Sequence, residues 1–83
     1  MKIELAARQL EILHSLREQQ NDRERMLFDN VINGRLAKGD IAAICELINN
    51  EYLMRGVNDD FNPNDYGLEL EALIDTINKP RLQ

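Results

Sequence analysis

The sequence predicts an all-α fold, a compact bundle of about four short helices forming one domain over residues 1–83. Apolar residues recur at helical spacing in four segments, and turn-forming residues separate those segments. Hydrophobic residues make up 43% of the chain, which is enough for a folded core. A chain of 83 residues buries a thin core, so we also expect it to gain stability as a homodimer.

The first helix is expected over residues 6–19. Leu10, Leu13 and Leu16 recur on one side of this segment, as in an amphipathic helix that packs on a core. Residues 2–5 alternate between charged and apolar side chains, so the chain could open with a short strand.

The second helix is expected over residues 22–33, because capping residues stand at both ends. Asn21 is a typical N-cap, and Glu24 three residues later is typical of a capping box. Gly34 stands where a left-handed residue often closes a helix.

The third helix is expected to begin at Lys38 or Asp40 and to end at Arg55. Gly56 follows it and predicts another left-handed cap. Its apolar face consists of Ile41, Ile44, Cys45, Ile48 and Tyr52.

The fourth helix is expected over residues 65–78. Asn64 or Asp65 can cap its start, and Pro80 cannot continue it. Its apolar stripe is formed by Tyr66, Leu70, Leu73, Ile74 and Ile77. Short connections between the four segments favour antiparallel neighbours.

Negative charge is concentrated in the C-terminal third of the chain. The net charge is −5, and residues 56–78 contain no Lys or Arg. Such a surface disfavours direct binding to nucleic acid or to anionic membranes, since both need clustered basic residues. The acidic residues of this segment are Asp59, Asp60, Asp65, Glu69, Glu71 and Asp75.

The composition predicts a cytoplasmic location. Cys45 is the only cysteine, so no disulfide forms within the chain. Charged side chains interrupt the first residues, which do not resemble a signal peptide, and no apolar run is long enough to cross a bilayer.

No catalytic constellation is apparent, so we expect neither an enzyme nor a bound cofactor. Cys45 and His14 could form a nucleophile–base pair, but Cys45 lies on an apolar stripe, where a cysteine is usually a small buried hydrophobe. The four glycines are scattered and are interpreted as helix punctuation rather than as a phosphate loop.

Residues 58–69 partly match a calcium-binding EF-hand loop. Oxygen-bearing side chains occupy positions one, three, five and seven, and Glu69 occupies position twelve. Pro63 stands where such loops need glycine, and the fourth helix must begin inside the segment. We therefore favour a capped connector and expect no metal site.

Glu51 is expected to project between Leu47 and Ile48 on the apolar face of the third helix. Arg55 follows four residues later, in the order that favours an ion pair on a helix. A partly buried ion pair is the favoured interpretation, and a catalytic base with a raised pKa is the alternative.

These observations predict a small acidic protein-interaction module that acts as an adaptor or regulator of another protein. Its partner is expected to be a protein, and a basic one. Two alternatives remain: an inhibitor, like an immunity protein or antitoxin, that covers the basic surface of a nucleic-acid-binding protein, and a weak metal-binding or enzyme-associated protein. The residues expected to contact the partner are Asp59, Asp60, Phe61, Asp65 and Glu69.

Phe61 has two alternative roles in this scheme. It could fold back as a lid on the core, or it could stand exposed as a binding anchor surrounded by polar residues.

Overall fold

The computed structural model describes residues 5–35 and 37–79. Within them the chain forms four helices and no strand, which confirms the all-α class. The helices are α1 (Ala7–Glu18), α2 (Asp22–Ile32), α3 (Lys38–Arg55) and α4 (Asp65–Asn78). Each lies within one residue of its expected boundaries. The short strand expected over residues 2–5 falls almost entirely outside the described residues.

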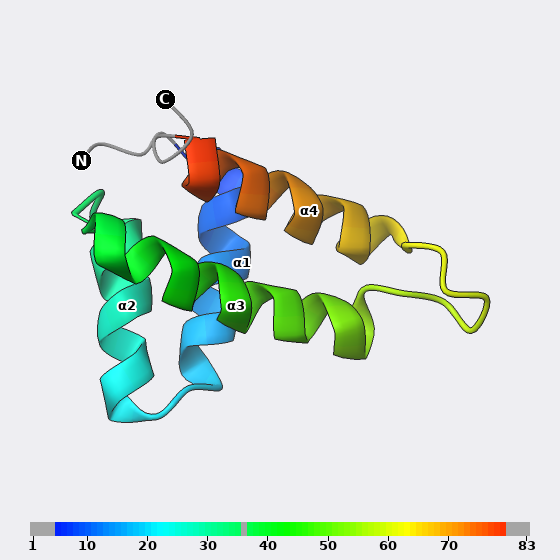
Figure 1. Ribbon diagram of the computed structural model, residues 1–83, viewed down its shortest axis with the longest axis horizontal. Coiled ribbons are helices and arrows are strands. Elements are labelled where there is room, and N and C mark those ends of the chain that lie inside the picture. Colours follow the sequence, from blue (N-terminus) through cyan, green and yellow to red (C-terminus); the bar gives the residue numbers. More distant parts are fainter. Residues whose placement is uncertain (1–4, 36, 80–83) are drawn as a thin grey trace.

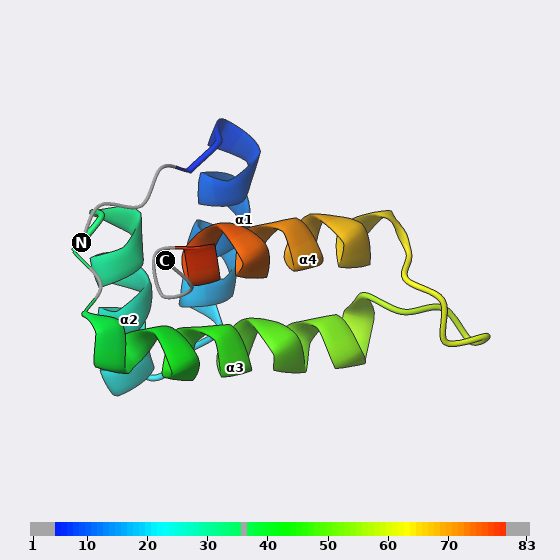
Figure 2. The same ribbon diagram turned by 45° about the horizontal axis from the view of Figure 1, so that its top comes forward.

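The four helices form two antiparallel pairs that cross steeply (Figure 1). Helices α1 and α2 make one pair, and α3 and α4 make the other; both views show the second pair extending past the first (Figures 1 and 2). The loop over residues 57–64 therefore projects from the body of the protein at the far end of the α3–α4 pair.

The core lies where the two pairs cross, and all four helices contribute to it. Phe28 is the largest fully buried side chain. The other buried apolar residues are Ile12, Leu13, Leu16, Val31, Ile41, Ile44, Ile48, Leu70, Leu73 and Ile77.

Side-chain caps fix the starts of two helices. The Oδ1 atom of Asn21 accepts a hydrogen bond from the Glu24 amide at 2.9 Å, and Asn64 Oδ1 accepts one from the Gly67 amide at 2.7 Å. Gly34 has the left-handed backbone expected after α2, with φ at 71°. These contacts satisfy amide groups that a helix start leaves without an intrahelical partner.

Gly56 and Gly67 have a different role from the one that the sequence suggests. Gly56 is not left-handed, since its φ is −96°, and Gly67 lies inside α4. A Cβ atom on Gly67 would lie 1.9 Å from the carbonyl oxygen of Gly56. Gly56 does end α3, as its position in the sequence predicts, but without the left-handed backbone, and interpreting Gly67 as helix punctuation was wrong. Together the two glycines allow the backbones of α3 and α4 to touch.

None of the described helices is both long enough and apolar enough to span a membrane.

Candidate protein-interaction site

Backbone contacts hold the base of the α3–α4 loop. The amide of Asn64 donates to the carbonyl of Gly56 at 2.9 Å, and its side-chain Nδ2 donates to the carbonyl of Arg55 at 2.9 Å. The same side chain caps α4 through Oδ1. Asn64 therefore ties the end of α3 to the start of α4, beside the contact between Gly56 and Gly67.

Beyond this base, the loop forms a small hairpin. Val57 and Pro63 make an isolated antiparallel bridge. The amide of Asn58 donates to the carbonyl of Asn62 at 2.8 Å, and the amide of Phe61 donates to the carbonyl of Asn58 at 2.9 Å. The tip thus consists of three residues: Asp59, Asp60 and Phe61.

Phe61 occupies the most unusual position in this hairpin. Its φ is 67°, and it is the one described residue other than glycine with positive φ. Three-residue hairpin loops commonly place a left-handed residue here, and the position favours glycine. A bulky residue in this conformation costs about 1 kcal/mol or more.

The ring of Phe61 does not cover the core. Its side chain is 87% exposed, so the hypothesis of a lid was wrong. The loop therefore exposes an aromatic ring to water. It does so in a backbone conformation that is unfavourable for a bulky residue.

Other apolar side chains are exposed at the same end of the protein. Leu53 and Met54 lie in the last turn of α3, and Leu68 lies in the first turn of α4. With Phe61, they make up four of the five large apolar side chains that the described residues leave exposed.

The acidic residues of this region differ in their partners. Asp60 accepts hydrogen bonds from the amide and the side chain of Asn62, and these bonds lower the pKa of its carboxyl group. Asp59 and Asp65 are exposed, and neither has an ion-pair partner within the described ranges.

Glu69, unlike Asp59 and Asp65, has an ion-pair partner. Its carboxylate pairs with the guanidinium of Arg8 on α1, and this bond lowers the pKa of Glu69. Arg8 and Glu69 are distant in the sequence, so local charge counting could not detect the pair. We therefore assign Glu69 to holding α4 against α1 and leave it out of the candidate site.

The buried carboxylate of Glu51 stabilises the ends of α3 and α4 next to the loop. Glu51 is 8% exposed, and its two oxygens accept hydrogen bonds from Tyr66 Oη at 2.8 Å and from Arg55 Nη1 at 3.4 Å. Burial, together with the Glu51 carboxylate, raises the pKa of Tyr66 to about 12, so its hydroxyl stays protonated and donates. Arg55 Nη1 also donates to the side chain of Gln19, the residue that follows α1, at 3.2 Å.

These contacts give Glu51 a structural role. Its oxygens hold the end of α3 against α4 through Tyr66 and, through Arg55, close to α1.

The loop does not assemble a calcium site. Helix α4 begins at Asp65, inside the EF-hand-like segment, while Asn64 caps that helix and Glu69 pairs with Arg8. Among residues 5–35 and 37–79, no three His, Cys, Asp or Glu side chains converge on a position that could hold a metal ion.

Cys45 and His14, the two candidate catalytic residues, have different environments. Cys45 is partly buried against the core from α3. His14 is exposed on α1 and lies near Asp29, whose pKa is lowered mainly by a hydrogen bond from Arg17.

Comparison with known proteins identified no relative. No family model, no curated protein and no solved structure matches the chain.

Proposed function

We propose that this protein is a protein-interaction module that binds a basic partner protein through the α3–α4 loop. The observation that carries the proposal is Phe61, an exposed aromatic ring held at a left-handed hairpin position. Folding alone favours glycine here, so both the strain and the exposed ring need another explanation. An aromatic anchor within a polar rim is a frequent centre of protein–protein binding.

The acidic residues beside Phe61 supply the second half of the proposal. Asp59 and Asp60 flank the ring in the tip, and Asp65 follows at the start of α4. Carboxylates at the rim of an interface attract a basic partner and raise its association rate, while a buried aromatic slows dissociation. Leu53 and Leu68 would add apolar area around the anchor.

Reversing the charge of the tip should slow binding without unfolding the protein. We expect Asp59→Lys with Asp60→Lys to reduce the association rate of the captured partner about tenfold or more at low salt and to flatten its salt dependence. The partner is first identified by quantitative capture from the native cell, and association is then followed by stopped flow across a salt series.

The control for this pair is Glu11→Lys with Glu18→Lys, which changes net charge equally but lies on α1, where both carboxylates are exposed and pair only with an arginine of the same helix. It should slow association much less. If both double variants associate at the same rate, net charge alone is responsible, and the tip has no special role.

A second candidate function uses the same surface for inhibition. Five acidic residues of the C-terminal third are exposed without a basic partner among the described residues: Asp59, Asp60, Asp65, Glu71 and Asp75. Such a surface could compete with nucleic acid for a basic protein, as immunity proteins and antitoxins do. If so, the captured partner should bind DNA or RNA, and the wild-type protein should displace the nucleic acid from that partner.

Self-association is a separate prediction. The exposed apolar side chains and the thin core both favour a homodimer. Light scattering after gel filtration at tens of micromolar protein should give twice the chain mass of 9.6 kDa. A mass near 9.6 kDa would contradict it.

A further inference from the structure

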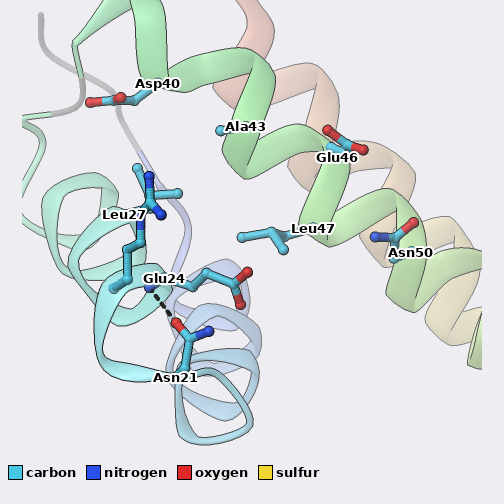
Figure 3. Close-up of a pocket in the computed structure, with 9 residues that line it drawn as sticks. Asn21, Glu24, Leu27, Asp40, Ala43, Glu46, Leu47 and Asn50 are labelled. Atoms are coloured by element: carbon cyan, nitrogen blue, oxygen red, sulfur yellow. Dashed lines mark hydrogen bonds between the residues drawn. The ribbon is translucent and has the colours of Figure 1, made fainter.

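A groove runs along the side of α3 that faces the α1–α2 turn. It consists of two adjoining hollows of about 610 and 180 Å³, which share Leu47 and Asn50. Helix α3 forms one wall, while the end of α1 and the start of α2 form the other. In Figure 3, Leu47 points from α3 towards α2, and Glu24 reaches from α2 into the same space.

The α3 wall carries a second helical stripe, apart from the one that faces the core. Ala43, Leu47, Asn50 and Met54 follow one another at intervals of four, three and four residues. Residues at this spacing form a seam along which a second helix can pack. Ala43, Asn50 and Met54 are exposed, so no described element covers these three positions, while Leu47 is half-buried against the edge of the core.

The rim of the larger hollow is acidic. Glu24, Asp40 and Glu46 line it, against the single guanidinium of Arg23. None of the three carboxylates has a hydrogen-bond or ion-pair partner in the part of the chain that the structure describes. An occupant with positive charge would supply the missing partners.

We propose that this groove binds a basic amphipathic α-helix of a partner protein. Apolar residues of that helix, at four- and three-residue intervals, would pack on Leu47 and Met54, while its Lys and Arg side chains would face the acidic rim. The proposal rests on the proposed function as an interaction module and specifies the structural class of the partner. From Asp40 to Met54 the groove spans about 21 Å, the length of about four helical turns.

A helix fits this groove better than a strand or a second copy of the chain. The described residues offer no open strand edge beside the groove, which disfavours a bound strand, and the four- and three-residue spacing of the α3 stripe matches a packed helix. A second copy of this chain is disfavoured, because it would bring the same carboxylates against each other.

The test uses a fluorescein-labelled model peptide of leucine and lysine, about 18 residues long, with leucine at alternating four- and three-residue intervals. A peptide of the same composition in scrambled order is the control. Fluorescence anisotropy measures affinity for the full chain, and amide chemical shifts map the contact. We expect the patterned peptide to bind at least about tenfold more tightly than the scrambled one, with shifts along residues 40–54.

Two variants of α3 separate the groove from its surroundings. Ala43→Arg places a bulky cation in the groove, whereas Ala42→Arg makes the same change on the adjacent exposed residue, outside it. Ala43→Arg should weaken peptide binding about tenfold or more, and Ala42→Arg by less than about twofold. Phe61→Gly should leave peptide binding unchanged, so this test does not depend on the role of the loop.

Four results would overturn the proposal: no binding of the patterned peptide, equal binding of the scrambled peptide, equal effects of the two arginine variants, or shifts confined to the acidic loop. A dimer that Ala43→Arg converts to a monomer would also overturn it, because the occupant would then be a second copy of the chain.

Discussion

Replacing Gly67 with alanine should destabilise the protein by about 2 kcal/mol or more. The new Cβ atom would lie 1.9 Å from the carbonyl oxygen of Gly56, which is backbone and cannot rotate away. Helices α3 and α4 would have to move apart. Forced overpacking typically costs about 1–3 kcal/mol and occasionally more, and a clash this close with rigid backbone belongs at the upper end of that range, about 3 kcal/mol or above. This cost outweighs the gain of about 1 kcal/mol that alanine brings to a helix interior.

Gly39→Ala is the matched control for this prediction. Gly39 also lies in a helix, but nothing lies within 4 Å of the position of its Cβ. The same substitution should therefore raise stability, by up to about 1 kcal/mol. Urea unfolding followed by circular dichroism measures both variants. Equal shifts of the two midpoints would show that α3 and α4 do not touch at Gly67.

Glu51→Ala should have the second-largest effect, a loss of about 1–3 kcal/mol. The substitution leaves the Tyr66 hydroxyl without its acceptor and opens space beside the buried end of α3. The loss stays below that of a fully buried ion pair, because Arg55 is about half exposed and remains in water.

Glu46→Ala is the control for Glu51, since Glu46 is exposed on the same helix. Its stability should stay within about 0.5 kcal/mol of wild type. Glu71 is less suitable as a control, because it accepts a hydrogen bond from Tyr52 and, after burial, contributes to the raised pKa of that tyrosine. Equal urea midpoints for Glu51→Ala and Glu46→Ala would contradict the role assigned to Glu51.

The helices and two of their caps could be predicted from the sequence, because both depend on neighbours three or four residues apart. Periodic apolar residues and Asn21 are local signals of this kind. The contact between Gly56 and Gly67 depends on how α3 and α4 cross, so the sequence showed Gly56 only as the end of a helix and Gly67 was mistaken for helix punctuation.

The candidate site was predictable only in part for the same reason. Turn residues and acidic charge identified the loop, but the exposure of Phe61 depends on where the loop projects from the fold. Arg8 neutralises Glu69 from another helix, which local charge counting could not detect. The groove beside Leu47 could not be predicted, because its two walls come from different helices. The sequence of α3 shows only that Leu47 lies beside an apolar face.

The affinity of the captured partner for Phe61→Gly tests the central claim most directly. Glycine removes the ring and suits the left-handed backbone, so the variant should be at least as stable as wild type. If Phe61 is the anchor, the dissociation constant should rise about tenfold or more while the melting temperature is unchanged or higher. An unchanged dissociation constant, or a clearly lower melting temperature, would contradict the claim that Phe61 is exposed for binding.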